Sequence, residues 1–319
     1  MIHHRDTEGA EITQRLGCYS ILSAHPLSPL CLGGESHLDN TAKPFVMRIY
    51  EWLSIFFFSM FIALAWLRPL AREQRRRATA IGVLGIAVCL IMPFARRSLS
   101  PIISVARDLL PALLMVMAYW QTGCLVGASN KKLQMRLETV DRKLFGAISG
   151  HHQNRRGRNW IMGYLECAYL FCYLMIPLGV GVLYLMKMRL YVQQYWAVIL
   201  PASYLCYAST AFFQTLPPHT RLRDPYFGAP SNKIRVLNLF IVRTATIRLN
   251  TFPSAHVAAS VAAGLALFRP APLAGMIYLW LSLSIAIGAV VGRYHYAVDA
   301  LAGAASAAAI FLLVTIYSG

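Results

Sequence analysis

The stretch LAGMIYLWLSLSIAIGAVVGRYHYAVDALAGAASAAAIFLLVTIY, residues 273–317, decides the fold class of this chain. It contains two apolar runs, residues 273–292 and 297–317, joined by the short polar segment 293–296. Each run has about the 20 residues that a helix needs to cross a hydrocarbon core of roughly 30 Å. Because lipid offers no hydrogen-bond partners to a bare backbone, we predict two membrane-spanning helices joined by a tight connection.

Six further apolar stretches precede this pair, at residues 49–67, 79–94, 109–127, 160–185, 195–216 and 252–268. Hydrophobic residues make up 57% of the 319 positions and charged residues 13%, a composition that is rare in water-soluble proteins. We predict an all-α, integral membrane helical bundle of about eight spans. The second and sixth stretches are shorter than a bilayer crossing requires, so the count is fixed only to within one or two.

The first 46 residues differ from the rest of the chain. They hold five of the thirteen acidic residues and no periodic apolar pattern, which predicts a disordered N-terminal tail, with Met47 as an alternative start of the protein. We expect residues 47–158 to form accessory spans and an interfacial helix. Residues 159–319 are expected to form the catalytic core.

Two segments outside the predicted spans have helical amphipathic spacing. Apolar residues recur among cations at 133, 137, 140 and 144, and again at 234, 237, 241 and 245, which predicts helices lying in the membrane interface. The sixth and eighth spans are rich in small residues, which allow helix backbones to approach closely. We therefore predict that these two spans pack together through Ala259, Ser260, Ala263 and Gly264 on one side and Ala300, Gly303, Ala304 and Ala307 on the other.

The net charge of +17 comes from 30 Lys and Arg against 13 Asp and Glu. Basic loops that face anionic headgroups are the simpler explanation for such a charge, and an anionic substrate is the alternative. The seven cysteines show no Cys-x-x-Cys spacing, so no disulfide framework or zinc site is expected. We expect no metal or cofactor and no nucleic-acid partner, and the oligomeric state is left open.

Ionisable residues are expensive at membrane depth, so their clusters indicate function. One cluster, residues 250–256, contains Ser254, Ala255 and His256 at the start of the sixth span; the other, residues 292–299, lies between the seventh and eighth spans. Spans that alternate in direction place both clusters and the fifth-to-sixth connection on one side of the membrane. His295 and Asp299 are four apart, so on a helix the carboxylate can orient one imidazole nitrogen and leave the other as a base or nucleophile.

These two clusters resemble the motifs of the type-2 phosphatidic acid phosphatase superfamily, which shares its fold with the vanadium haloperoxidases. The family carries Pro-Ser-Gly-His and an Arg, His, Asp motif in which the histidine precedes the aspartate by four. This chain has PSAH at 253–256 and HYAVD at 295–299, followed by ALAG at 300–303. The resemblance covers about residues 160–319 and is nearest to the branch of the inositol phosphorylceramide synthases.

The resemblance implies a phosphohistidine mechanism. His295 would attack phosphorus while Asp299 holds its tautomer, and His256 would protonate the leaving alkoxide and then activate the acceptor. Phosphate would be bound by Ser254 and by backbone N–H groups near Ala255 at the start of the sixth span.

Three positions depart from the family pattern. Ala255 stands where the family has glycine. The family's third-motif arginine falls at Ala289, whereas this chain has Arg293, one helical turn further along, either as a phosphate ligand or as an interfacial anchor. The family's first motif is absent, and Arg221 is our choice for that phosphate ligand, ahead of Arg223 and Arg248.

The leading hypothesis is a membrane phosphatase that hydrolyses a lipid phosphate, with the lipid phosphate and the membrane lipids as its partners. The alternatives are a phosphotransferase that moves a phospho-headgroup to a lipid alcohol, and a non-enzymatic membrane transporter. We expect location in the cell (inner) membrane. Twenty of the thirty cations lie on the predicted active-site side, which the positive-inside rule places in the cytoplasm, whereas the resemblance implies the opposite side.

Two carboxylates at span starts, Asp108 and Glu166, are left outside the predicted site. Each is interpreted either as a paired structural carboxylate or as a group that orients an acceptor hydroxyl.

Overall fold

The computed structural model describes residues 47–91, 93, 101–127, 129–151, 159–220, 233–247 and 249–318. Regular structure in these ranges is helical, apart from an isolated antiparallel bridge between Thr215 and Asn250, so the all-α prediction is confirmed. The predicted tail, residues 1–46, lies outside the described residues. The helices are α1 (Ile49–Leu67), α2 (Arg72–Ile91), α3 (Pro101–Gly123), α4 (Lys131–His151), α5 (Asn159–Leu185), α6 (Val192–Thr210), α7 (Lys233–Thr244), α8 (Ala255–Phe268), α9 (Pro272–Val291) and α10 (Ala297–Ser318), with 3₁₀ turns η2 (Arg189–Tyr191) and η3 (Pro218–Thr220).

Five of the described helices, α1, α3, α5, α9 and α10, are long and apolar enough to cross a membrane. The predicted count of eight is therefore not confirmed. The helices α6 and α8 lie in the interior of the bundle, where twelve of 19 and ten of 14 residues are buried. α8 is apolar but, at 14 residues, too short to cross a membrane, whereas the buried α6 needs less hydrophobicity than a lipid-facing helix. The remaining predicted span, α2, has four arginines among its first six residues.

Several helix boundaries differ from those of the predicted spans. α2 and α3 begin at Arg72 and Pro101, several residues before the apolar runs, because hydropathy marks the part of a helix that suits lipid and not its first turn. α6 ends at Thr210 instead of residue 216, and the chain then turns and forms the bridge at Thr215. α8 begins at Ala255, directly after Pro253 and Ser254.

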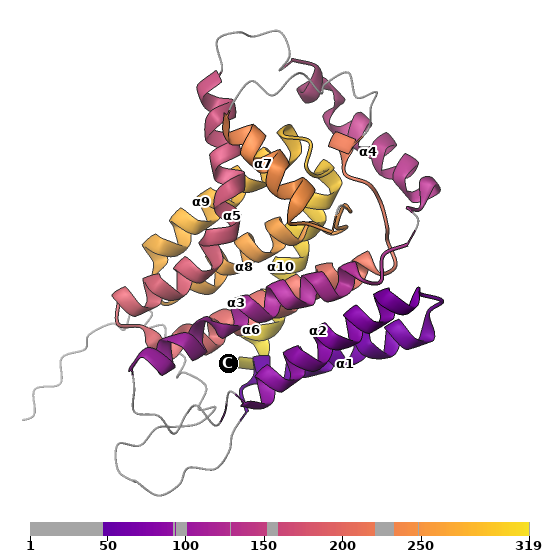
Figure 1. Cartoon of the computed structure of the whole chain (residues 1–319). Coiled ribbons are helices and arrows are strands. Elements are labelled where there is room, and N and C mark those ends of the chain that lie inside the picture. Colours follow the sequence, from indigo (N-terminus) through magenta and orange to yellow (C-terminus); the bar gives the residue numbers. More distant parts are fainter. Residues whose placement is uncertain are drawn as a thin grey trace, which may run out of the picture.

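α8 lies at the centre of the bundle, in contact with α5, α6, α9 and α10 (Figure 1). The predicted packing of the sixth and eighth spans is confirmed, because α8 and α10 are in close contact, although Gly264 of α8 faces Leu279 of α9. A Cβ added at Gly303 would lie 2.5 Å from the Ser254 carbonyl oxygen, so only glycine permits this approach. The Ser254 amide also donates to the Asp299 carbonyl oxygen at 2.9 Å, which ties the start of α8 to the first turn of α10.

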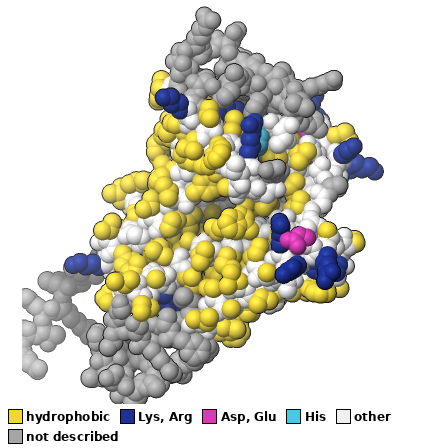
Figure 2. Space-filling view, in the orientation of Figure 1, with side chains coloured by type: hydrophobic (Ala, Val, Ile, Leu, Met, Phe, Trp, Pro, Cys, Tyr) yellow, Lys and Arg dark blue, Asp and Glu magenta, His cyan; other side chains and the backbone are white. Residues whose placement is uncertain are grey.

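The side chains on the outside of the bundle are distributed as expected for a membrane protein. In the view of Figure 2 the middle of the visible surface is mostly hydrophobic, and most of the Lys and Arg side chains lie toward its edge. The two amphipathic helices predicted outside the spans are α4 and α7, and in Figure 1 they lie together at one end of the molecule. The turn after α1 is held to the end of α6, because Arg68 Nη1 donates to the Ala211 carbonyl oxygen at 2.7 Å.

Candidate active site

The connection between α9 and α10 is a tight turn that presents His295. The Tyr294 and His295 amides both donate to the Ala289 carbonyl oxygen, at 2.9 and 3.1 Å. Arg293 has a φ of 63°, in the left-handed region that a non-glycine residue adopts at some cost. The prediction that Arg293 continues the face of Ala289 one helical turn on is wrong, because α9 ends at Val291 and the turn redirects the chain.

The two predicted histidines meet at this turn. His295 Nε2 lies 3.4 Å from His256 Nδ1, so the end of α9 and the first turn of α8 bring together rings 39 residues apart in the chain. On its other side, His295 Nδ1 lies 3.7 Å from Asp299 Oδ2. That distance is longer than a hydrogen bond, and His295 precedes α10 instead of lying on it. The carboxylate nevertheless faces the ring nitrogen that it was expected to orient.

Asp299 is fixed by two groups to which the sequence analysis assigned no role. Its Oδ2 accepts hydrogen bonds from Asn250 Nδ2 at 2.7 Å and from the Tyr296 amide at 2.9 Å. Asn250 is in turn held against Thr215 by its backbone amide and its side chain. Through Asn250, the segment after α6 therefore helps to hold the Asp299 carboxylate in place, although it is distant in sequence.

Four buried polar atoms at this site have no hydrogen-bond partner within the described part of the chain. They are Ser254 Oγ, Asn250 Oδ1, His295 Nδ1 and Asp299 Oδ1. Buried polar groups are normally paired, and a cluster of unpaired ones indicates a site that a polar ligand completes. Ser254 is also the N-cap of α8 without using its hydroxyl to cap the helix, so that hydroxyl is available to an anion.

The backbone donor predicted at Ala255 already has a partner, because its amide donates to Thr251 Oγ1 at 3.3 Å. That bond is long, and the first-turn amides of a helix have no partners within the helix itself. The N-terminus of α8 therefore still offers donors and the positive end of a helix dipole to a phosphate near Ser254.

Arg293 points to α4. Its Nη1 lies 3.4 Å from Asp141 Oδ2, and its side chain is only 16% exposed, which does not fit an interfacial anchor. Asp141 Oδ1 accepts from the Ala297 amide at 2.7 Å and so caps the first turn of α10. Burial raises the pKa of the Asp141 carboxyl, whereas the Ala297 amide and the Arg293 guanidinium act against that rise.

Glu166 of α5 holds the same turn from the opposite side. Its Oε2 accepts from the Tyr294 hydroxyl at 2.7 Å and from Asn238 Nδ2 at 2.8 Å, while its Oε1 pairs with Arg235 Nη1 at 2.8 Å. The ring of Tyr294 stacks on Tyr169 with centroids 4.1 Å apart. Glu166 is thus a paired structural carboxylate, and the structure it supports is the turn that carries His295.

His256 lies among aromatic rings of α5. The ring of Tyr173 meets it edge-on with centroids 5.4 Å apart, and the ring of Tyr169 lies 5.6 Å away. These rings limit the access of water to the His256 side of the pair.

The first-motif ligand cannot be placed, because Arg221, Arg223 and Arg248 lie outside the described residues. The residues just before Arg221 do reach the site. The His219 amide donates to the Arg293 carbonyl oxygen at 3.1 Å, and the His219 ring lies edge-on to Tyr294. Burial lowers the pKa of His219 below its ordinary value.

Sequence reasoning missed Asn250, Asp141, Glu138 and the positioning role of Glu166. A weak signal existed for Asn250, which stands in the same polar segment as His256. The two residues of α4 gave no signal, because their partners lie more than 150 positions away.

Comparison with known proteins gave a match to a family model described as the PAP2 superfamily, over residues 135–313, which is more than half of the chain. No curated protein and no solved structure matches the chain. The match begins inside α4 and ends inside α10, so it includes every residue of the site described above.

Proposed function

The chain belongs to the PAP2 superfamily, and from this premise we propose that it hydrolyses the phosphate ester of a membrane lipid through a phosphohistidine intermediate. Members of the superfamily are generally phosphatases or related phosphoryl-transferring enzymes, and an activity of that kind is assigned to this chain. The observation that carries the finer proposal is the approach of His295 Nε2 to His256 Nδ1, with Asp299 on the opposite edge of the His295 ring.

In the first step, the lone pair of His295 Nε2 forms a bond to phosphorus as the ester P–O bond breaks. His256 in its protonated form gives its proton to the departing lipid alkoxide. In the second step, His256 takes a proton from water as the water oxygen attacks phosphorus. The bond between phosphorus and His295 Nε2 then breaks, which frees His295 and releases inorganic phosphate. His295 therefore serves first as nucleophile and then as leaving group, while His256 serves first as acid and then as base.

Asp299 keeps the proton of His295 on Nδ1, which leaves Nε2 as the nucleophile. The 3.7 Å separation is long in the absence of substrate, as is common for catalytic contacts that tighten in the reacting complex. Asn250 and the Tyr296 amide hold the carboxylate in place. The distance between His295 Nδ1 and Asp299 Oδ2 therefore shortens by movement of the imidazole and not of Asp299.

Negative charge on the phosphoryl oxygens is stabilised by Ser254 Oγ and by the N-terminus of α8. Arg293 is the described cation next to His295, and Arg221 is the proposed ligand from the preceding segment. For Arg293 to reach phosphate, its guanidinium must exchange Asp141 for the substrate.

A lipid substrate is supported by the position of the site. His256 lies in the first turn of an interior helix and His295 at the end of a long apolar one, so the pair lies where the spans reach the membrane surface. A phosphate in the headgroup layer can enter this end while its acyl chains stay among the spans.

The test is release of inorganic phosphate from phosphatidic acid by the full chain in detergent or nanodiscs, without added acceptor. We expect His295→Ala and His256→Ala each to lower kcat by at least about 10³-fold while gel filtration and thermal unfolding stay those of the wild type. His219→Ala is the matched control, since it removes a half-buried histidine that contacts the same turn but neither of the nitrogens proposed to react. Full activity in either catalytic variant contradicts the mechanism.

The same assay separates hydrolysis from transfer. Phosphate released in the absence of any alcohol supports the phosphatase. A product that forms only when diacylglycerol or ceramide is added, from a phosphodiester donor, supports the phosphotransferase instead.

A further inference from the structure

The two faces of α4 differ in chemistry. On one face, Gln134, Leu137 and Asp141 are buried and Glu138 is half-buried, at successive helical spacings. The opposite face is exposed and lines a shallow depression of about 510 Å³, formed by Lys132, Met135, Arg136, Thr139, Val140 and Lys143. Val140, which was expected on the apolar stripe beside Leu137, therefore lies on the cationic face.

The buried face of α4 holds the turn that carries His295. Glu138 Oε1 accepts from the Tyr296 hydroxyl at 3.2 Å, and Asp141 contacts both Arg293 and the Ala297 amide. These contacts involve the residue after His295, the residue two before it and the first turn of α10. A shift of α4 therefore moves the groups on both sides of the proposed nucleophile.

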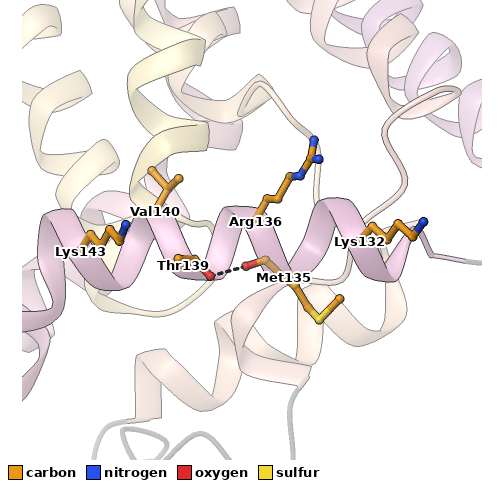
Figure 3. A pocket seen from close by; sticks show the side chains of 6 residues that line it. All are labelled: Lys132, Met135, Arg136, Thr139, Val140 and Lys143. Carbon is orange, nitrogen blue, oxygen red and sulfur yellow. Dashed lines mark hydrogen bonds between the residues drawn. The ribbon is translucent and has the colours of Figure 1, made fainter.

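The exposed face of α4 carries both cations and apolar side chains, so it is suited to contact a surface that is negatively charged and partly apolar. Figure 3 shows the six side chains spread along the helix, with Lys132, Arg136 and Lys143 separated by Val140 and Met135. Met135 is 55% and Val140 40% exposed. The depression has no carboxylate in its lining, and none of its three cations forms an ion pair within the part of the chain that is described.

The position of α4 in the chain determines what lies next to this face. α4 connects α3 and α5, both of which are long and apolar enough to cross a membrane, so it must run where those spans reach the surface. Cations at that level attract the phosphate groups of anionic lipids, and apolar side chains between them reach the acyl boundary.

We propose that the exposed face of α4 binds the anionic headgroups of the surrounding bilayer, and that this contact sets the position of the catalytic turn through Glu138 and Asp141. The proposal rests on the proposed function, whose site it regulates. Bound lipid holds α4 against the turn, so turnover rises with the fraction of anionic lipid. The lipid that binds α4 is a part of the bilayer and is not hydrolysed.

The experiment uses the full chain in nanodiscs of phosphatidylcholine with increasing phosphatidylglycerol, and a fixed fraction of phosphatidic acid as substrate. The measured quantity is the ratio of kcat at high and at zero phosphatidylglycerol. We expect a ratio well above one for the wild type and about one for the triple variant Lys132→Gln, Arg136→Gln, Lys143→Gln. The activity of this variant in nanodiscs without phosphatidylglycerol should equal that of the wild type, because its three changed side chains are exposed.

Two controls separate charge at α4 from charge in general. The variant Arg72→Gln, Arg76→Gln, Arg77→Gln removes the same charge from exposed positions in the first turns of α2, and we expect it to keep the wild-type ratio. Lys132→Arg with Lys143→Arg retains the charge on α4 and should also keep it. Equal ratios in the α4 and α2 triple variants overturn the proposal.

Native mass spectrometry provides a readout that does not depend on catalysis. The α4 triple variant should retain fewer phosphatidylglycerol molecules after detergent extraction than the α2 variant does. Equal retention overturns the binding site, and reduced retention with an unchanged kcat ratio overturns the coupling. A wild type that hydrolyses no lipid phosphate in any bilayer contradicts the proposed function, and lipid retention then decides the binding site separately.

Discussion

Two buried aspartates lie at opposite ends of this bundle and have different surroundings. Asp108, near the start of α3, accepts from Arg48 Nη1 at 2.9 Å, from Arg189 Nε at 3.0 Å and from the Tyr184 hydroxyl at 2.6 Å. Both of its oxygens are therefore paired, and two cations balance its charge. Asp299 accepts on one oxygen only, from two neutral donors, and its other oxygen has no partner among the described residues.

This difference indicates what each end does. A carboxylate between two cations is already neutralised, and it joins the start of α1 and the segment after α5 to α3. A carboxylate without a cation stabilises positive charge that develops nearby, as on an imidazole that attacks phosphorus. Asp108 thus serves stability, and Asp299 has the surroundings expected of a group that serves the reaction.

The largest effect is expected at Asp299. Asp299→Asn should lower kcat by about 10³- to 10⁴-fold, because the amide no longer holds the proton of His295 on Nδ1. Thermal unfolding in detergent should change little, because Asn can still accept from Asn250 and the Tyr296 amide. An unfolding transition that falls in parallel with kcat would show that Asp299 is structural and would remove the contrast with Asp108.

At the opposite end, Asp108→Asn should act on stability. It leaves Arg48 and Arg189 without their counter-charge, which lowers the free energy of unfolding by on the order of 3 kcal/mol. Denaturant titration in detergent measures this loss, and kcat per folded molecule should match the wild type. Loss of kcat with unchanged stability would give Asp108 a role in the reaction.

A smaller effect on kcat is expected at Glu166, which is paired with a cation as Asp108 is but lies close to the proposed site as Asp299 does. It is paired with Arg235 as Asp108 is paired, yet it also holds the turn beside His295 through the Tyr294 hydroxyl. Tyr294→Phe and Glu166→Gln should each lower kcat about tenfold with KM unchanged, as is typical of groups that orient a catalytic residue.

A double-mutant cycle tests whether these two residues act through their shared hydrogen bond. The double variant should then be no slower than the Glu166→Gln variant. Effects that multiply would mean that Tyr294 and Glu166 act independently.

The membrane class was predictable, and the residues proposed to react could be named, because both depend on local sequence patterns. In an apolar run such as 273–292, the backbone N–H and C=O groups can find hydrogen-bond partners in lipid only by forming a helix, whatever surrounds the run. The spacing of His295 and Asp299 is likewise a local feature of the sequence. The meeting of His256 with His295 followed from the alternation of spans, which fixes the end at which a residue emerges. Hydropathy did not predict the interior position of α6 and α8, because burial by neighbouring helices replaces contact with lipid.

The groups that hold the site were not predictable in the same way. Asn250 reaches Asp299 across 49 positions, Glu166 reaches Tyr294 across 128, and Asp141 reaches Ala297 across 156. A hydrogen bond of this kind depends on the direction of a single side chain, which no periodicity records. The free energy of one such hydrogen bond is also small compared with the free energy of burying apolar surface, which drives helix packing. It therefore has no visible effect on the amino-acid composition.

The sequence by itself therefore determined that this protein is a helical membrane protein, that it carries two histidine motifs and that the motifs emerge at one end. Only the tertiary structure decided which carboxylate is paired with two cations and which has none among the described residues, and that α4 contacts the turn that carries His295. The physical reason is that the membrane constrains every backbone group in a span, whereas the state of a buried charge depends on the few side chains that folding brings within about 3 Å of it.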